Sequence, residues 1–503
     1  MEILDDIRKW SRDISDDSQR VLWLTGIPGA GKSAVTASFA RELGDKGCLW
    51  AQFFFNRNDA KTLNPATLLP TIARQLADHC HDVAQHLYDT LKAKRSLVDD
   101  ISDEQAQKLF LAAIEVASSL SPSQPIVIVI DALDESDAAR LRFTAKTLAK
   151  AALGLPHNAK IFISSRPEHV ISTAFRSKHI KNIDLDTSTP SSSSDVSSFL
   201  TKGMQEIAVD YDLGSAWPGN ERLQVLCERA SGLFIWAATV LSFIRDQIND
   251  RGESCAQEVL NLLDEEGMGD INALYHNILD TTFARPTENL FAALRRIIGI
   301  IVNLREPLCL AAIEELLGWR ENPLPVGLVH FVRQFRTVLV VNADATIDEN
   351  TVPRLHKSFV EFISSERTDS RFRISESVAN TELALACFRI MTSELHFNIC
   401  KLETSYLRND QVPDLSSRIE QNIRRHLSYA CCLWSSHLQA VQAAQSENHF
   451  VGEVRNFLYN NFLYWLEVLS FLKQLGSVEK MLLVLQHWSY VSTDLVEPCR
   501  ALC

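Results

Sequence analysis

A glycine-rich segment near the N-terminus has the residue types needed to hold a phosphate chain. Residues 26–33 fit the pattern G-x-x-x-x-G-K-S, between an apolar stretch at 21–25 and a helical pattern at 32–43. Glycines let the backbone approach phosphate oxygens, and the N–H groups at a helix start attract anions. Lys32 is expected to reach the β- and γ-phosphates, and the Ser33 hydroxyl to bind Mg²⁺. The residues expected to bind the nucleotide are Gly26, Ile27, Pro28, Gly29, Ala30, Gly31, Lys32, Ser33 and Ala34.

An apolar run that ends in aspartate follows at residues 126–131. This is the Walker B pattern, in which Asp131 at the strand end holds Mg²⁺. Asp134 and Glu135 come directly after it, where a carboxylate polarises an attacking water. The alternative is that these two residues only cap the helix that begins near residue 137.

A second apolar run, residues 160–165, ends in Ser-Ser and is followed by Arg166. If this strand lies beside the strand at 21–25, Arg166 is near the phosphates and can stabilise the γ-phosphate. The alternative is a surface arginine that pairs with a nearby carboxylate.

The composition is that of a globular chain without a nucleic-acid or membrane surface. The 503 residues carry a net charge of −13, and 46% of them are hydrophobic. The acidic balance argues against broad binding to nucleic acid or anionic lipid. The eleven cysteines show no metal-binding spacing, and we find no signal peptide and no apolar stretch that would span a membrane. We expect a cytoplasmic protein of about three or four domains.

Strand and helix patterns alternate over the first 190 residues, which predicts an α/β domain with a mostly parallel sheet. A helix at 64–79 and a capping box from Ser102 to Gln105 lie between strands. The Ser/Thr-rich stretch 187–198 is interpreted as a linker. Residues 221–248 read as a helix interrupted at Gly232, and from 375 to the end the pattern is helical. Strands are expected at 21–25, 48–55, 126–130, 160–165, 180–185 and 337–341.

Taken together, the P-loop, the acidic block 131–135 and Ser164-Ser165-Arg166 resemble the NACHT class of STAND P-loop NTPases. Flanking stretches, such as 53–57, 230–237 and 426–434, are similar to its fungal branch. The resemblance implies a P-loop NTPase sheet of AAA-like order 5-1-4-3-2, followed by all-α and winged-helix domains. It implies the division 1–20 N-terminal helix, 21–190 nucleotide-binding domain, 191–268 small helical domain, 269–370 winged helix and 371–503 C-terminal helical domain.

The resemblance also implies roles for single residues. Arg166 would act as a sensor of the γ-phosphate. The segment at Gly232 would close over the nucleotide, although Phe234 stands where many relatives have proline. His356 resembles a histidine that contacts the bound diphosphate; the alternative is a helix-face histidine with no ligand. An acidic chain without a basic recognition helix is not expected to use the winged helix on DNA.

The function that the resemblance implies is an ATP/ADP-binding switch that uses Mg²⁺, hydrolyses ATP slowly and self-associates in the ATP state. It would act in fungal self/non-self recognition or innate-immunity-like signalling, with effector or sensor partners still to be identified. Only 25 residues precede Gly26, and neither an effector module nor C-terminal repeats are evident. The alternatives are a nucleotide-stabilised scaffold without significant hydrolysis and a metabolic P-loop kinase.

Overall fold

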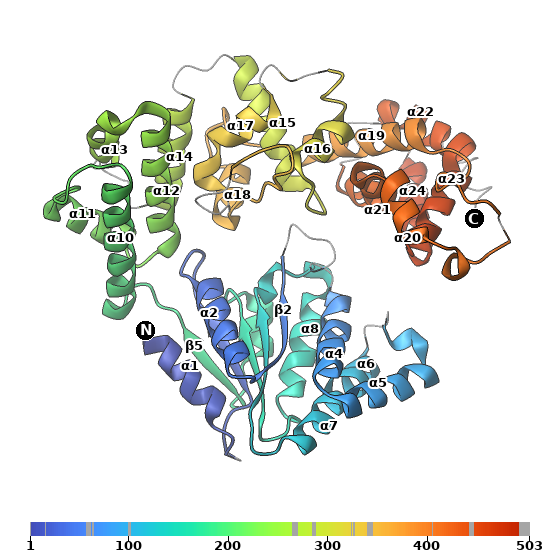
Figure 1. Ribbon diagram of the computed structural model, residues 1–503, viewed down its shortest axis with the longest axis horizontal. Helices are drawn as coiled ribbons and strands as arrows, with labels where there is room; N and C mark the ends of the chain where they lie inside the picture. Colours follow the sequence, from blue (N-terminus) through green and yellow to red (C-terminus); the bar gives the residue numbers. More distant parts are fainter. Residues whose placement is uncertain are drawn as a thin grey trace. The chain divides into compact units, whose positions relative to one another are not determined.

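A five-stranded parallel sheet organises the first of two units, Met1–His276 and Asn277–Cys503 (Figure 1). The computed structural model describes residues 2–491 except 16, 57–61, 63–64, 99–101, 264–269, 284–287, 323, 325–326, 340–345, 405 and 442–446. The strand order is β2-β3-β4-β1-β5, which confirms the predicted order. The strands are β1 Val21–Thr25, β2 Leu49–Phe54, β3 Ile126–Asp131, β4 Ala159–Ser164 and β5 Ile180–Asp184.

The three central strands are fully buried because helices cover both faces of the sheet. Alternate side chains of each strand therefore enter two separate cores. One core lies under α1 (Glu2–Arg12) and α2 (Lys32–Asp45). The helices over the other core are α4 Leu68–His79, α5 His81–Ala93, α7 Ala112–Leu120, α8 Ala138–Ala151 and α9 His169–Ala174.

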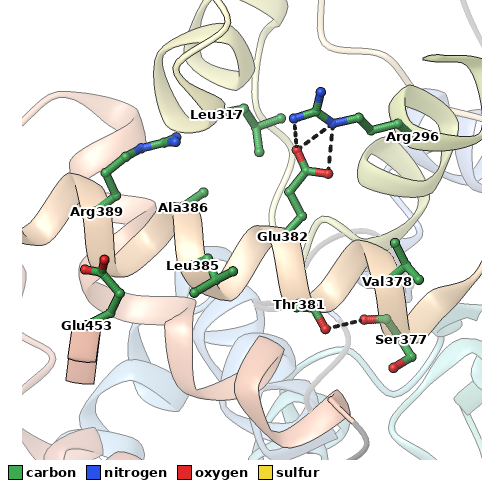
Figure 2. Close-up of a pocket in the computed structure, with 10 residues that line it drawn as sticks. All are labelled: Arg296, Leu317, Ser377, Val378, Thr381, Glu382, Leu385, Ala386, Arg389 and Glu453. Atoms are coloured by element: carbon green, nitrogen blue, oxygen red, sulfur yellow. Dashed lines mark hydrogen bonds and ion pairs between the residues drawn. The ribbon is translucent and has the colours of Figure 1, made fainter. Parts of the chain in front are cut away.

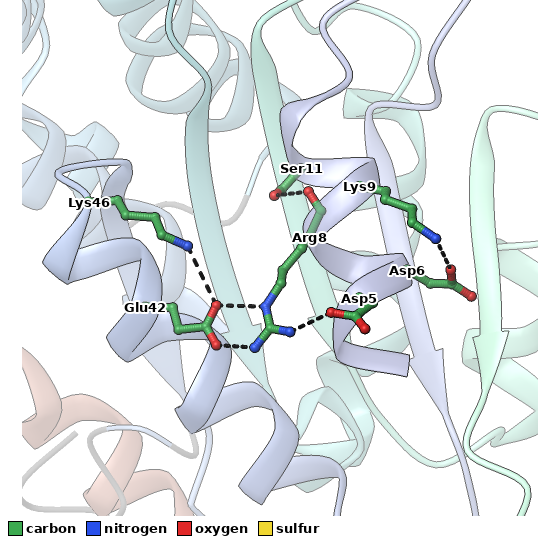
Figure 3. A network of polar contacts seen from close by, with 7 residues as sticks. All are labelled: Asp5, Asp6, Arg8, Lys9, Ser11, Glu42 and Lys46. Carbon is green, nitrogen blue, oxygen red and sulfur yellow. Dashed lines mark hydrogen bonds and ion pairs between the residues drawn. The ribbon is translucent and has the colours of Figure 1, made fainter. Parts of the chain in front are cut away.

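The N-terminal helix α1 is fastened to α2, the helix that begins at the P-loop lysine. Ile7 and Trp10 are buried against the sheet. On the outer side Arg8 donates to both carboxylate oxygens of Glu42, from Nε at 2.9 Å (Figure 3). These hydrogen bonds lower the pKa of Glu42. The α1 helix thus packs as part of the first unit.

The linker expected at 187–198 is wrong, because most of it is helical. Helix α10 spans Pro190–Asp210, and the Thr189 side chain accepts a hydrogen bond from the Ser192 N–H at 3.2 Å. Threonine at the N-cap and proline in the first turn both favour the start of a helix. A composition rich in serine, threonine and proline, which predicted a linker, therefore begins a helix here.

The expected capping box is half right. The Ser102 side chain accepts from the Gln105 N–H at 3.2 Å. The Gln105 side chain, however, donates to the Leu97 carbonyl at 2.8 Å. Gln105 is almost fully buried, so its amide satisfies a buried carbonyl in place of the cap.

Helices make up the rest of both units. The predicted break at Gly232 is confirmed, because it separates two helices there. The helices that complete the first unit, the last of which crosses its boundary, are α11 Asn220–Ala230, α12 Phe234–Arg251, α13 Ala256–Leu263 and α14 Ile271–Thr282. Those of the second unit are α15 Glu288–Asn303, α16 Leu310–Leu317, α17 Leu328–Gln334, α18 Lys357–Ser364, α19 Glu376–Glu394, α20 Leu415–Asn422, α21 Arg425–Ala440, α22 Glu447–Asn456, α23 Phe462–Phe471 and α24 Val478–Val491.

The strand expected at 337–341 is wrong for its described residues. Arg336–Val338 form a 3-10 turn, and Leu339 makes one isolated antiparallel bridge to Leu355; 340 and 341 lie outside the described residues. A β-branched run predicts a strand only where a partner strand is available. No helix in the described part of the chain is long and apolar enough to cross a membrane. The five-part domain division stays a prediction.

Candidate functional site

The P-loop connects the central strand β1 to α2. Gly31 adopts a left-handed conformation, φ 97°, immediately before the helix. The Lys32 ammonium lies over the loop and donates to the Gly26 and Ile27 carbonyls at 2.8 and 2.9 Å. The first N–H groups of a helix have no intrahelical acceptor. The loop therefore presents a cation and helix-start donors together, as phosphate binding requires.

Asp131 lies at the carboxyl end of β3, two strands from β1, with 4% of its surface exposed. Its Oδ1 accepts a hydrogen bond from the Ser164 hydroxyl at the end of β4. The same hydroxyl oxygen accepts from the Ala132 N–H at 3.1 Å. Asp131 Oδ2 has no hydrogen-bond partner among the described residues. Asp131 is thus held on one oxygen and keeps a second one for a cation, which fits Mg²⁺.

Asp134 lies on the 3-10 turn Leu133–Glu135 that follows β3. Its Oδ1 accepts from the Arg166 N–H at 3.1 Å, and its Oδ2 lies 3.5 Å from Arg166 Nε. The Asp134 side chain is only 4% exposed and that of Arg166 is 20% exposed. The acidic loop and the end of β4 are therefore joined by a partly buried ion pair.

The sequence left two alternatives for Arg166: a contact with the γ-phosphate, or a surface pair with a carboxylate. Arg166 does pair with a carboxylate, but it follows β4, the strand next to β1, at the same edge of the sheet as the P-loop. Glu135 is half-buried on the same turn. Helix α8 begins after Asp137, whose carbonyl accepts from the Arg140 and Leu141 N–H groups.

Sequence reasoning missed the part played by Ser164, the last residue of β4, and by Ser165, which follows it. Ser164 orients Asp131, and Ser165 accepts from the Trp23 indole N–H at 2.8 Å. Both serines are fully buried. Two adjacent serines at the end of an otherwise apolar strand were the available signal, since a buried hydroxyl needs a partner.

The segment after Gly232 packs directly on the P-loop. The Ile235 N–H donates to the Gly29 carbonyl at 3.3 Å, and a Cβ at Gly29 would overlap the Ile235 side chain. The Phe234 ring lies beside Gly31 and packs against Phe199 of α10, with ring centroids 5.9 Å apart. The segment after Gly232 therefore lies against the P-loop, and its expected closure over a bound nucleotide stays a prediction.

His356 belongs to the second unit, where it is the N-cap of α18. Its side chain accepts from the Ser358 N–H at 3.2 Å. Capping of α18 is thus one local role for the His356 side chain. Its predicted contact with a diphosphate stays a prediction.

The second unit contains a hollow of about 670 Å³ beside α19 (Figure 2). Arg296 forks onto Glu382 through Nε at 2.8 Å, and Arg389 donates to the Leu316 carbonyl at 2.8 Å. Both arginines that line the hollow thus have protein partners, and the contacts give it no ligand chemistry.

Comparisons with known proteins agree with the site. Residues 3–166 match the family described as Nephrocystin 3, N-terminal. The chain is 22% identical over 493 residues to the vegetative incompatibility protein HET-E-1 of Podospora anserina. The match covers 91% of this chain and 34% of that protein, so the chain spans about a third of the relative's length.

Two solved structures are also similar over most of their length. A Walker-type ATPase of Pyrococcus abyssi is 12% identical with a TM-score of 0.34, and the match covers 70% of this chain and 93% of that one. A chain of the Drosophila ORC bound to DNA is 15% identical with a TM-score of 0.26, covering 72% and 98%. The fold assignment rests on the strand order and the P-loop, not on these scores. The P-loop, the acidic loop and the match to the incompatibility protein together agree with the resemblance of this chain to fungal NACHT-type P-loop proteins.

Proposed function

We propose that this chain is a nucleotide-controlled switch in fungal incompatibility signalling. It is closed with ADP, opens and self-associates with ATP, and resets by slow hydrolysis. The observation that supports this most is the contact of Phe234 and Ile235 with the P-loop. A ligand bound at the loop and the helical segment would contact the same glycines, Gly29 and Gly31. A change of the bound nucleotide would therefore change the position of the segment.

Each residue of the site has a role in this proposal. Lys32 and the N–H groups of residues 29–34 bind the phosphates. Ser33 and Asp131 would hold Mg²⁺, with Ser164 keeping the Asp131 carboxylate in place. Bound Mg²⁺ would neutralise charge on the phosphate oxygens. Glu135 is the candidate to orient the attacking water.

The Asp134–Arg166 pair supplies a difference between the two nucleotide states. Without a γ-phosphate, the guanidinium keeps Asp134 as its anionic partner. A γ-phosphate is a second anion for the same guanidinium, and it exists only in the ATP state. A ligand shifts a conformational equilibrium only through such state-specific contacts. The pair thus gives ATP and ADP different effects on the acidic loop.

The test begins with the nucleotide that copurifies with the chain. Its identity is determined, and the particle size is then compared in ADP and in a non-hydrolysable ATP analogue. Retained ADP and larger particles with the analogue support the switch. Rapid turnover that requires an added small-molecule acceptor would instead identify a kinase.

A pair of variants separates the switch from a scaffold that binds nucleotide without using it. Glu135→Gln should bind ATP but hydrolyse it more slowly, so that ATP-driven assembly persists longer. Lys32→Ala should neither retain nucleotide nor assemble. If both variants have the same size distribution as the parent chain in every nucleotide, the scaffold function holds and the switch does not.

A further inference from the structure

The two edges of the sheet are treated differently. At the β2 edge, the Gln75 side chain of α4 pairs with the outward backbone of Gln52. Its Oε1 accepts from the Gln52 N–H and its Nε2 donates to the Gln52 carbonyl, both at 2.9 Å. A glutamine amide used in this way occupies the place of a neighbouring strand and blunts the edge.

The β5 edge lies on the opposite side of the sheet (Figure 1), and within the described residues no side chain pairs with its backbone as Gln75 pairs with Gln52. The Leu185 N–H donates to the Thr25 carbonyl of β1, so in a parallel ladder the N–H groups of 182 and 184 point away from β1. The Ile180 N–H donates locally to Ser177. The backbone N–H groups of Asn182 and Asp184 have no acceptor among the described residues.

Hollows flank this edge on both faces of the sheet. The larger, about 640 Å³, is lined by Asn182 and Asp184 together with Arg176 and Lys178. The smaller, about 320 Å³, is lined by Lys181 and residues of the 9–19 segment. Side chains of an extended segment alternate between two faces, so a strand laid along β5 would send alternate side chains into each hollow.

The charges favour one kind of occupant. Arg176 and Lys178 are exposed, and neither forms an ion pair within the described part of the chain. Asp184 lies at the other end of β5, where its carboxylate already accepts from Thr25 Oγ1 at 2.8 Å. The smaller hollow is lined by two lysines, Lys9 and Lys181, and by two aspartates, Asp13 and Asp17, so its charges balance. The first face therefore suits acidic side chains and the second suits neutral ones.

We propose that the β5 edge binds an extended segment of a partner protein as a sixth strand. The segment carries carboxylates at alternate positions, directed at Arg176 and Lys178. Backbone hydrogen bonds to residues 182 and 184 provide affinity, and the charge pattern provides selectivity. None of residues 26–34 lines either hollow, and the proposal does not depend on the switch function.

The probe is a fluorescein-labelled peptide, acetyl-Thr-Glu-Val-Glu-Val-Glu-Thr-amide, titrated with the whole chain by fluorescence anisotropy. We expect saturable binding that weakens at least about tenfold when alternate peptide nitrogens are methylated. The matched peptide with lysine in place of glutamate should not compete. Lys32→Ala should bind the peptide as the parent chain does, which separates this result from any failure of the switch.

Two variants of the chain locate the site. Asn182→Pro removes one outward N–H at an edge position that tolerates proline, and Arg176→Glu with Lys178→Glu reverses the charge. Each should weaken binding at least about tenfold. The proposal is overturned if no saturable binding occurs at about 1 mM peptide, or if the N-methylated peptide binds as well as the parent peptide. If Asn182→Pro does not fold, the N-methylated peptide and the charge reversal decide the question.

Discussion

The two units each contain a cluster of buried polar side chains, and the two clusters differ in how their members are bonded. In the second unit, Tyr429 bonds His437 Nε2 at 2.7 Å, and His437 Nδ1 bonds Asn380 Oδ1 at 2.8 Å. Asn380 Nδ2 then donates to Asn303 Oδ1 at 3.0 Å, and Asn303 to the Gly299 carbonyl. These four side chains are at most 5% exposed.

The cluster at the carboxyl edge of the sheet has a different pattern. Asp131 is buried as deeply as the second-unit cluster, yet its Oδ2 has no partner within the described residues. The first N–H groups of α2 likewise have no acceptor within their own helix. The comparison shows that burial alone does not mark a functional group. A network whose side chains bond one another stabilises a fold, whereas one that leaves a carboxylate oxygen beside helix-start donors can bind a ligand.

The largest expected effect is a loss of stability when a member of the second-unit cluster, Asn380, is replaced by an apolar residue. Asn380→Leu leaves the His437 and Asn303 groups without a partner in a buried site. Each unsatisfied group costs about 1–3 kcal/mol, so we expect a loss of about 3 kcal/mol in the free energy of unfolding. Chemical denaturation measures it, and ADP affinity should stay as in the parent chain. A loss of ADP binding in the folded variant would contradict the division into a structural and a ligand-binding cluster.

Removal of the P-loop cation should have the opposite effect, with a lower affinity for nucleotide and an unchanged free energy of unfolding. Lys32→Ala should lower nucleotide affinity by about 100-fold, equal to about 2.7 kcal/mol, because the phosphate charge loses its principal counter-ion. Isothermal titration calorimetry with ADP measures this change. Lys46→Ala, directly after the end of the same helix and paired with Glu42, is the matched control and should bind normally.

Ser164→Ala tests whether the hydroxyl that bonds Asp131 contributes to Mg²⁺-dependent binding of ATP. The hydroxyl that holds Asp131 is lost, while the carboxylate itself remains. Partners that orient a metal ligand contribute about 10–100-fold in affinity, so we expect Mg²⁺-dependent ATP binding to weaken by about tenfold. Magnesium-free ADP binding should change little, and an equal loss with and without Mg²⁺ would point to a general packing defect.

The smallest expected effect is a pH dependence of the second unit. Burial lowers the pKa of His437 from an ordinary value of 6.5 to about 3. Between these values the unfolded chain binds a proton that the folded chain does not, so stability falls as pH decreases from about 6.5. At pH 5.5 the loss from this group is about 1 kcal/mol.

Denaturation at pH 7.5 and 5.5 tests this dependence. His437→Gln should remove the His437 part of it, whereas His179→Gln, at an exposed position of the first unit, should not. An unchanged pH profile in His437→Gln would show that the histidine is not neutral in the folded state.

Local sequence patterns were sufficient to predict the five strands of the sheet and the charged residues at their carboxyl ends. The run from 126 to 131 predicted a buried strand that ends in a carboxylate, and the glycine spacing predicted the loop before α2. The same local logic failed at 187–198 and 337–341. Serine and threonine cap a helix as readily as they form a linker, and a β-branched run needs a partner strand that the sequence does not reveal.

Local sequence patterns were enough to predict the five strands, the P-loop and the candidate residues, because strand periodicity and glycine spacing act over a few neighbouring residues. Which groups bond to one another depends on the three-dimensional fold. Only the fold brings Ser164 to Asp131, Arg166 to Asp134 and Ile235 to Gly29, across separations of 33, 32 and 206 positions. Such contacts depend on which strands and helices lie side by side, and that arrangement follows from the packing of the whole core.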